Sequence, residues 1–522
     1  MAGLSAAQLL PFLDLLGHSD RSSALGANFW TIPPSGWANL LVPLFHCYRS
    51  PAGVYFQPGQ DWTSSYYPGV GILALGLSAV VLVRTPRVRL LFATAVLGFI
   101  IAMGEPGRLY PWLLKLFPPL GFMRYPIKFE FLTVFALPLL AAFAITGLST
   151  AAAAAGSKAA RWIWTLAIFL AATIGALVWY SHAHPLPGEP WQTAGLSGLT
   201  RALFLLLILA VALRHARNQQ LRQQVFTGLL LLVLLWLDVV THAPRQNPTV
   251  AASVYQPGLV TQQLKINPQP GSARAFLERQ AHDLVYGWML PDPDRDYLGR
   301  RAALLGDCNL LDGIPTPAGF FSVYVREQPA IFSDLFNAAT NHFPAGLADF
   351  VGIAWLSNPA RLSDWQFRPS SLPVCTLGPR PVFAEPSQMP ALLLEPDFDA
   401  RKMVYLAPET KVWLTVTNPA QGTVRIVQYA AQRQVFETEA GTAALLVLAQ
   451  TYYHPWRAYV DDQPVRLCRA NYAFQALEVP AGTHRVMLRY EDRAFRAGAI
   501  ISLAALIGSL ISVCWRRQES EG

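Results

Sequence analysis

The sequence predicts a polytopic α-helical membrane bundle with an extracytoplasmic α/β region and a C-terminal β-sandwich, closed by a final transmembrane helix. Three observations lead to this prediction. The 522-residue chain is 53% hydrophobic and only 14% charged, whereas soluble domains carry about 25% charged residues. Apolar blocks recur from residue 66 to 240 and once more near 497, around a long stretch of ordinary soluble composition. From about Met403 the hydrophobic period changes to two, which is typical of strands.

Seven apolar runs are each about 16 to 20 residues long, about the length that crosses the hydrocarbon core of a bilayer. Trp and Tyr stand at many of their ends, as in an interfacial belt. The predicted spans are Tyr66–Val83, Val88–Met103, Phe129–Leu148, Trp162–Tyr180, Gly195–Leu213, Val225–Val240 and Ala497–Trp515.

The N-terminal segment is apolar from Met1 to Gly17 but has no positively charged region before it, so it does not resemble a signal peptide. It is typical of the second half of a membrane helix. Residues 18–65 are rich in Gly, Pro and aromatic residues, and we expect an ordered loop at the membrane surface.

Basic residues in the short loops predict the orientation of the bundle. If the seven spans alternate, four basic groups fall on one side, and the positive-inside rule places that side in the cytoplasm. Residues 18–65, 104–128 and 241–496 are then outside. Arg201, just inside a span, is expected to snorkel outward. The four groups are Arg84, Arg87 and Arg89; Lys158 and Arg161; Arg214, Arg217 and Arg222; and Arg516 and Arg517.

These features divide the chain into four parts. They are a transmembrane bundle at 1–240, an extracytoplasmic mixed α/β region at 241–402, an extracytoplasmic β-sandwich at 403–496, and a transmembrane helix with a short cytoplasmic tail at 497–522. In the α/β region we expect a helix over Ser272–Asp283 and a strand over Val351–Leu356. The sandwich strands are expected at Lys411–Thr417, Thr423–Tyr429, Ala443–Ala449, Trp456–Val460, Val465–Cys468, Ala473–Val479 and His484–Tyr490.

The net charge of +8 does not indicate nucleic acid, because many Lys and Arg residues lie beside apolar spans rather than on one soluble face. One predicted outside loop, 104–128, nevertheless carries four cations. They either pair with Glu105 and Glu130 or snorkel to lipid headgroups, or they form a phosphate site at the outer membrane surface. The residues proposed to bind substrate are Arg124, Tyr125, Lys128, Arg108, Lys115 and Asp61. Asp61 is predicted on the same side of the membrane as Arg124, where it would be a base or a cation ligand, or else an ordinary solvated carboxylate or an ion-pair partner.

Other polar groups are weaker candidates. His182 and His184 lack a suitably spaced carboxylate, and Asp292, Asp294 and Asp296 lack the glycine and closing Glu of a calcium loop, so both sets are interpreted as solvated loops. No metal site or cofactor is predicted, and the five cysteines are interpreted as unpaired thiols.

Two further groups have open interpretations. Asp238 and His242 are interpreted as a helix-end pair facing the headgroups, with proton handling as the alternative. Tyr452, Tyr453 and Trp456 either belong to the sandwich core or stack on a sugar ring.

Several segments resemble bacterial YfhO-like membrane proteins, in the same order along the chain. Leu120–Phe129 (LGFMRYPIKF) resembles their FRYP-x-K stretch, and Gln8–Pro11 with Ser19 and Arg21 resembles their QLLP segment. Asp238 with Asn247-Pro248 resembles their exit from the bundle. The most specific matches are Thr451–Asp461 (TYYHPWRAYVD), Arg469–Phe474 (RANYAF) and Val479–His484 (VPAGTH), although position 454 is His where the pattern favours Pro.

The resemblance implies a GT-C-like glycosyltransferase in the bacterial inner (plasma) membrane. It would move a sugar from a polyprenyl-phosphate donor to an extracytoplasmic acceptor such as a cell-wall polymer, with membrane lipid as its environment. Such proteins have earlier spans and an early loop with the catalytic acid, so this chain is expected to be the C-terminal portion, and its catalytic residue is unknown. The alternative is a non-catalytic, membrane-anchored scaffold that binds a glycan or a partner.

Overall fold

The computed structural model describes residues 2–19, 30–61, 63, 65–155, 157–187, 189, 191–243, 246–317, 319–338, 343–362 and 364–521. Arg21, much of the predicted surface loop and the side chains of Arg516 and Arg517 lie outside the described residues. The chain divides into two compact units. The helical unit comprises Ser22–Thr249 and Met289–Pro293, and the sandwich unit comprises Met1–Arg21, Val250–Trp288 and Asp294–Gly522.

The helical unit is built around α5 (Glu130–Ala155), which contacts four other helices. Small residues bring the backbones close, as is usual in membrane bundles. A Cβ on Gly98 would lie 2.9 Å from the Phe129 carbonyl oxygen, and one on Gly76 would lie 3.4 Å from that of Leu137. The other elements are the hairpin β1 (Tyr48–Arg49) and β2 (Tyr55–Phe56), and α2 (Val70–Leu82), α3 (Pro86–Ala102), α4 (Leu109–Leu116), α6 (Ser157–Ala183), α7 (Trp191–Arg217) and α8 (Leu221–Val240).

Five helices of the described chain are long and apolar enough to cross a membrane, so the protein is a multi-pass membrane protein. They cover Pro126–Thr150, Lys158–Ala183, Trp191–Arg217, Leu221–Val240 and Arg493–Trp515. The first two predicted spans also form helices, but these are shorter, at 13 and 17 residues.

Pro68 and Gly69 explain why α2 begins four residues later than predicted. Gly69 has φ +103°, a conformation that side chains rarely adopt, and a Cβ there would lie 3.2 Å from Asp238 Oδ2. The amide of Val70, the first residue of α2, donates to the Tyr67 hydroxyl (2.6 Å). Tyr66 and Tyr67 therefore end an extended segment and are not part of the helix.

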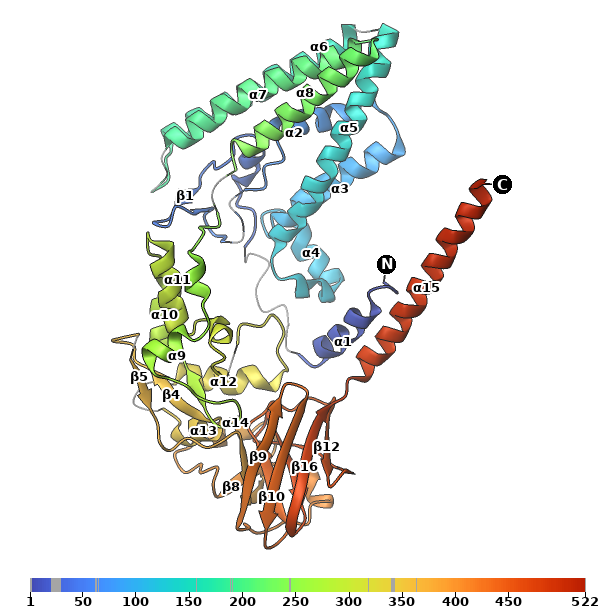
Figure 1. Ribbon diagram of the computed structural model, residues 1–522. Coiled ribbons are helices and arrows are strands. Elements are labelled where there is room, and N and C mark those ends of the chain that lie inside the picture. Colours follow the sequence, from blue (N-terminus) through green and yellow to red (C-terminus); the bar gives the residue numbers. More distant parts are fainter. Residues whose placement is uncertain are drawn as a thin grey trace. The chain divides into compact units, whose positions relative to one another are not determined.

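Within the sandwich unit, α1 (Ala6–Gly17) packs along α15 (Arg493–Glu521), as Figure 1 shows. The contact is close because α15 presents a glycine: a Cβ on Gly498 would lie 2.2 Å from the Ala6 carbonyl oxygen. The Ala7 amide also donates to Ser502 Oγ (2.9 Å). The apolar N-terminal segment is thus a helix paired with the final helix of the chain.

The sandwich consists of two sheets whose facing side chains form one core, including Phe436, Leu446, Trp456, Leu477 and Leu488. The five-stranded sheet has the order β13-β12-β16-β10-β9 and is antiparallel throughout. The six-stranded sheet has the order β6-β11-β15-β14-β8-β7, with β7 and β8 parallel. The strands are β6 (Cys375–Leu377), β7 (Arg380–Phe383), β8 (Met403–Leu406), β9 (Gly422–Ala430), β10 (Arg433–Ala440), β11 (Ala444–Leu448), β12 (Trp456–Val460), β13 (Gln463–Val465), β14 (Cys468–Ala470), β15 (Phe474–Val479) and β16 (Gly482–Tyr490).

The six-stranded sheet is buried on both faces. Leu446 and Leu448 of β11 belong to the sandwich core. Leu445 and Val447 belong to a second core, which includes Leu393 of α14 (Met389–Leu394) and other helical residues. Strands buried on both faces are expected to be continuously apolar, as β11 is. Because β7 and β8 pair across residue 403, the α/β region and the sandwich share this sheet.

The remaining elements surround the second core and a small sheet of order β3-β4-β5. They are β3 (Arg274–Phe276), β4 (Ile353–Ser357), β5 (Trp365–Phe367), α9 (Leu259–Leu264), α10 (Arg279–Gly287), α11 (Pro293–Ala302), α12 (Glu327–Asn337), α13 (Ala345–Phe350) and α14 (Met389–Leu394). The predicted strand at Val351–Leu356 corresponds to β4.

Some local predictions are wrong. Ser272–Asp283 is not one helix but the strand β3 followed by the start of α10. Lys411–Thr417 is not a strand, since a 3-10 helix covers Pro408–Val412. Val465–Cys468 is the connection between β13 and β14. The conformation of these segments depends on tertiary packing, so the hydrophobic period of the local sequence did not predict it.

Two polar segments form secondary structure that was not predicted. Asp294 and Asp296 lie in the first turn of α11, not in a solvated loop: Asp294 Oδ1 accepts from the Ala251 amide (2.8 Å), and Asp296 pairs with Arg300 (2.8 Å). Strand β10 was not predicted, because Gln434 and Thr438 interrupt its apolar pattern, although both are buried.

All five cysteines lie in the described part of the chain, and no disulfide joins any two of them. Cys375 and Cys468 lie in the six-stranded sheet, and burial raises the pKa of each thiol to about 12. Both thiols therefore stay protonated and unreactive at neutral pH.

We expect His484 of β16 to make a contribution to the free energy of unfolding that depends on pH. A hydrogen bond between its Nδ1 and Asp461 Oδ2 (2.6 Å) raises the pKa of His484, with a second bond to the Ala481 carbonyl. The stabilisation is complete below the ordinary pKa of about 6.5 and is lost as the pH rises through the folded pKa. Thermal unfolding in detergent should show His484→Gln less stable than wild type at about pH 5.5 and equal to it at about pH 8.5. An equal deficit at both pH values would contradict this assignment.

Candidate functional site

The loop between α3 and α5 contains most of the residues predicted to bind substrate. Gly104, at φ +65°, ends α3, and prolines then divide the loop into α4 and two 3-10 turns, Pro118–Met123 and Pro126–Phe129. Tyr110 is the buried residue of α4, whereas Trp112 and Leu116 are exposed. An amphipathic helix with exposed large apolar side chains is typical of a segment that lies in a membrane interface.

Arg124 and Tyr125 lie between the two 3-10 segments, and Lys128 lies in the second of them. The Lys128 ammonium lies 4.6 Å from the centre of the Tyr125 ring and donates to the Met123 carbonyl (3.4 Å). The Tyr125 ring in turn packs on Trp30 at 4.6 Å. The three predicted residues therefore form one local cluster, which we call the Arg124 turn.

Arg124 has two unusual features. Its φ is +56°, in the left-handed region that costs a non-glycine residue about 1–3 kcal/mol. Its guanidinium Nε is buried without a hydrogen-bond partner. A buried donor that makes no hydrogen bond costs about a further 1–3 kcal/mol. Strained backbone and an unsatisfied charged donor at one residue are typical of a binding site.

Arg108 and Lys115 line a neighbouring cavity in the same loop, of about 720 Å³. Arg108 is also left-handed, at φ +57°, and precedes the first residue of α4. The cavity contains a carboxylate as well, that of Glu105. The Arg124 turn does not contribute to its lining, so the predicted cations form two groups rather than one.

Two carboxylates were predicted near these cations. Asp61 is exposed after β2, and within the described part of the chain no ion pair joins it to Arg124. Glu130 begins α5 and is only 3% exposed, and neither of its carboxylate oxygens has a hydrogen-bond partner. The nearby Thr133 hydroxyl donates to the Ala95 carbonyl instead (2.9 Å). Glu130 is thus not the counter-charge of Lys128.

Arg201 and Asp238 form a buried ion pair that the sequence did not predict. Arg201 Nη1 donates to Asp238 Oδ1 (2.7 Å), and the two side chains are 2% and 0% exposed. The Tyr67 hydroxyl donates to the same carboxylate oxygen (2.8 Å). The predictions that Arg201 snorkels outward and that Asp238 faces the headgroups are therefore wrong, because each satisfies the other's charge between α7 and α8. An ionisable residue in each of two consecutive spans was the available signal.

His242 remains near this pair, with its ring 4.7 Å from that of Tyr67 and its Nε2 3.2 Å from Ser65 Oγ. Arg201, Thr241 and His242 line a cavity of about 480 Å³. His182 and His184, which were interpreted as part of a solvated loop, pack on aromatic rings: His182 on Trp191 and His184 on Tyr180.

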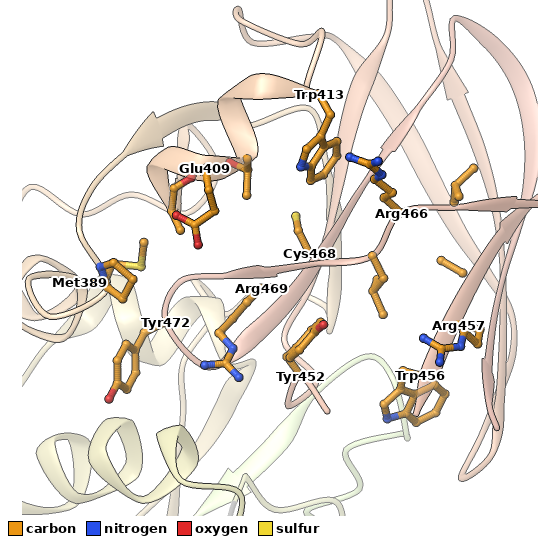
Figure 2. Close-up of a pocket in the computed structure, with 16 residues that line it drawn as sticks. Met389, Glu409, Trp413, Tyr452, Trp456, Arg457, Arg466, Cys468, Arg469 and Tyr472 are labelled. Carbon is orange, nitrogen blue, oxygen red and sulfur yellow. Dashed lines mark hydrogen bonds between the residues drawn. The ribbon is translucent and has the colours of Figure 1, made fainter. Parts of the chain in front are cut away.

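The sandwich unit contains a cavity of about 630 Å³ between β12, β13, β14 and the segment around Trp413 (Figure 2). Arg466 lies over the Trp413 ring at 5.7 Å, and Arg469 lies over the Tyr452 ring at 5.1 Å. Arg469 also pairs with Glu327 of α12. Trp456 both belongs to the sandwich core and lines this cavity. Aromatic faces flanked by guanidinium groups can stack on sugar rings and bind carboxylate or phosphate groups.

Two residues of the RANYAF segment, Asn471 and Tyr472, shape the six-stranded sheet beside this cavity. Asn471 and Tyr472, at φ +45° and +70°, form the turn between β14 and β15. Asn471 is buried, and its side-chain Oδ1 accepts a hydrogen bond from the backbone amide of Tyr405 (2.8 Å). The backbone amide of Asn471 donates to the Tyr405 carbonyl (2.8 Å). It therefore fastens β8 to the six-stranded sheet.

Together these observations define a multi-pass membrane protein that carries a β-sandwich joined directly to its last helix. The family model described as "Bacterial membrane protein YfhO" matches residues 404–502, from β8 into α15. The resemblance to YfhO-like proteins is thus confirmed for the C-terminal portion, which includes the Thr451–Asp461 and Arg469–Phe474 segments. No curated protein and no solved structure matched the chain.

Proposed function

We propose that this chain is a membrane glycosyltransferase-like protein that uses a polyprenyl-phosphate-linked sugar for the glycosylation of an extracytoplasmic glycan or cell-wall polymer. The observation that carries the proposal is Arg124, with its left-handed backbone and its buried guanidinium Nε that lacks a partner. The match of the C-terminal portion to a bacterial membrane protein family supports it.

The proposal requires the Arg124 turn to face the side from which lipid-linked sugars are used. Basic residues cluster at Arg84–Arg89 and at Arg214–Arg222, in and beside the short connections between helices. If these connections are in the cytoplasm, as the positive-inside rule predicts, the loop before α5 would be extracytoplasmic. Exposed Trp112 and Leu116 would hold this loop in the interface, at the depth of a lipid phosphate.

A phosphate in the Arg124 turn would supply what the turn lacks. Its oxygens accept hydrogen bonds from a guanidinium in a bidentate arrangement, and Lys128 adds a second positive charge. Each charge-assisted hydrogen bond contributes about 1.5–3 kcal/mol. Arg108 and Lys115 would bind the same headgroup from the neighbouring cavity, and Asp61 would act on the sugar or on a bound cation.

Arg124→Gly is expected to separate binding from stability. Glycine adopts the left-handed conformation without strain, so the variant should unfold at the same or a higher temperature. Loss of the guanidinium should weaken binding of a short-chain polyprenyl phosphate by about 10- to 100-fold. Binding is measured by intrinsic Trp fluorescence of the full chain in nanodiscs.

The matched control is Arg84→Gly, which removes an exposed arginine from the basic loop between α2 and α3 of the same unit. It should leave the affinity unchanged. The proposal fails if Arg124→Gly binds the lipid phosphate as tightly as wild type, or if Arg84→Gly weakens binding equally.

The second candidate function is a non-catalytic scaffold that binds a glycan, and the cavity between Trp413 and Trp456 favours it. It predicts that Trp413→Ala abolishes glycan binding by the full chain while no sugar transfer is detected. The full chain is needed because β6 and β7 precede residue 403, so a fragment starting there would lose two strands of the six-stranded sheet.

A further inference from the structure

The C-terminal end of α1 meets the loop before β12 in a cluster of side chains that no function described above uses. Asp14 and His18 are one helical turn apart, and His454 comes from the loop. His454 Nε2 lies 2.7 Å from Asp14 Oδ2, and the two imidazole rings are 4.7 Å apart. One nitrogen or oxygen atom from each of the three residues lies within 4.8 Å of the others. Residues far apart in the sequence therefore bring three potential metal ligands to one point.

The hydrogen bonds indicate which ring nitrogen of His18 has a lone pair free to bind a metal. His18 Nδ1 lies 2.8 Å from the Asp14 carbonyl oxygen, which can only accept, so Nδ1 carries the proton and Nε2 keeps a lone pair. His454 Nε2 faces a carboxylate and donates to it when no metal is bound. Two imidazoles and one carboxylate are a ligand set that Zn²⁺ uses at about 2.0–2.2 Å.

We propose that Asp14, His18 and His454 bind a divalent transition-metal ion, best matched by Zn²⁺, that fastens α1 to the β-sandwich. On binding, the metal takes the place of the proton on His454 Nε2, and that proton is released to solvent. The three side chains are 26%, 51% and 46% exposed, so an ion can reach them from solution. The fourth position is open to water.

The surroundings of the cluster hold its ligands in place. The Tyr453 hydroxyl donates to Asp14 Oδ2, which orients the carboxylate as outer hydrogen bonds do in metal sites. The Arg326 amide donates to the His18 carbonyl (2.9 Å), which ties the end of α1 to the segment before α12. The Ala7–Ser502 hydrogen bond fixes the other end of α1 on α15. The two metal-binding elements thus have defined positions before an ion arrives.

The test is a Zn²⁺ titration of the full chain in detergent, after treatment with a chelator, by competition with a chromophoric chelator. Wild type should bind one equivalent, and Co²⁺ in its place should show the visible absorption of a tetrahedral site. His18→Gln and His454→Gln should each weaken binding at least about 10-fold and remove this absorption. Tyr453→Phe should weaken binding several-fold without changing the stoichiometry.

The matched control is His484→Gln, which removes an imidazole that also bonds a carboxylate, that of Asp461, but is not in the cluster. It should bind Zn²⁺ like wild type. The proposal is overturned if wild type binds no Zn²⁺, if both cluster variants bind it as wild type does, or if the control loses it equally. His18 is an exposed side chain, so the metal-free His18→Gln variant should unfold at the wild-type temperature, and its titration alone decides the outcome if His454→Gln does not fold.

Discussion

Asp238→Ala is expected to lower the free energy of unfolding by about 3–5 kcal/mol, because it leaves the buried Arg201 charge without its partner. The carboxylate also accepts from Tyr67 and lies beside Gly69 at the amino end of α2, where a negative charge is favourable. Its loss therefore affects α2, α7 and α8 together. The measurement is equilibrium unfolding of the full chain in mixed detergent micelles.

A double-mutant cycle supplies the control for this pair. Arg201→Leu alone should destabilise by a similar amount, since it leaves the Asp238 carboxylate buried and unpaired. The Arg201→Leu/Asp238→Ala protein should be much more stable than the sum of the two single changes implies, because neither charge of the buried pair is then left without its partner. Additive losses would show that the two side chains do not stabilise each other.

Arg301→Ala is expected to destabilise the sandwich unit by about 3–5 kcal/mol. Arg301 and Asp312 are both fully buried, and the guanidinium Nε and Nη2 donate to the two carboxylate oxygens at 2.9 Å each. Arg301 also donates to the carbonyls of Val254 and Gln256. One side chain thus joins α11 to two other segments, and alanine would remove a hydrogen bond from each of four acceptors, of which Asp312 Oδ1 keeps only the bond from the Val260 amide (3.1 Å).

Arg279→Ala is the matched control for Arg301, since its pair with Asp283 is more than half exposed on both sides. Exposed pairs contribute about 0–1 kcal/mol, so this variant should unfold almost like wild type. Thermal unfolding followed by near-ultraviolet circular dichroism distinguishes the two variants. Equal losses for Arg301→Ala and Arg279→Ala would contradict the role assigned to burial.

The membrane spans and most sandwich strands could be predicted because their signals are local. A run such as Trp162–Tyr180 must be helical in a bilayer, where every backbone polar group needs a partner within its own segment. The alternation in His484–Tyr490 similarly indicates a strand with one buried face. The failures occurred where the partner is distant: β6 and β7 are short and become recognisable only by pairing with β11 and β8.

The candidate sites, too, could be predicted only as far as their signals are local in the sequence. Composition alone indicated that the loop before α5 is unusually basic for its predicted side, and the structure then showed which cation is strained and unsatisfied, namely Arg124. Nothing in the neighbourhood of Arg201 in the sequence indicated Asp238 as its partner, because 36 residues and a loop separate them in the chain. A lone charge in an apolar run shows that a partner is needed but not which residue it is.

Hydropathy, period and charge thus determined the multi-pass bundle, the sandwich and the basic loop, because each of these properties depends on neighbours along the chain. Packing decided which polar groups meet. It buried Arg201 against Asp238, joined β7 to β8 across the expected domain boundary, and placed His454 on Asp14. A side chain's partners are set by the approach of whole helices and sheets, and the free energy of that approach comes from apolar surfaces elsewhere in each unit.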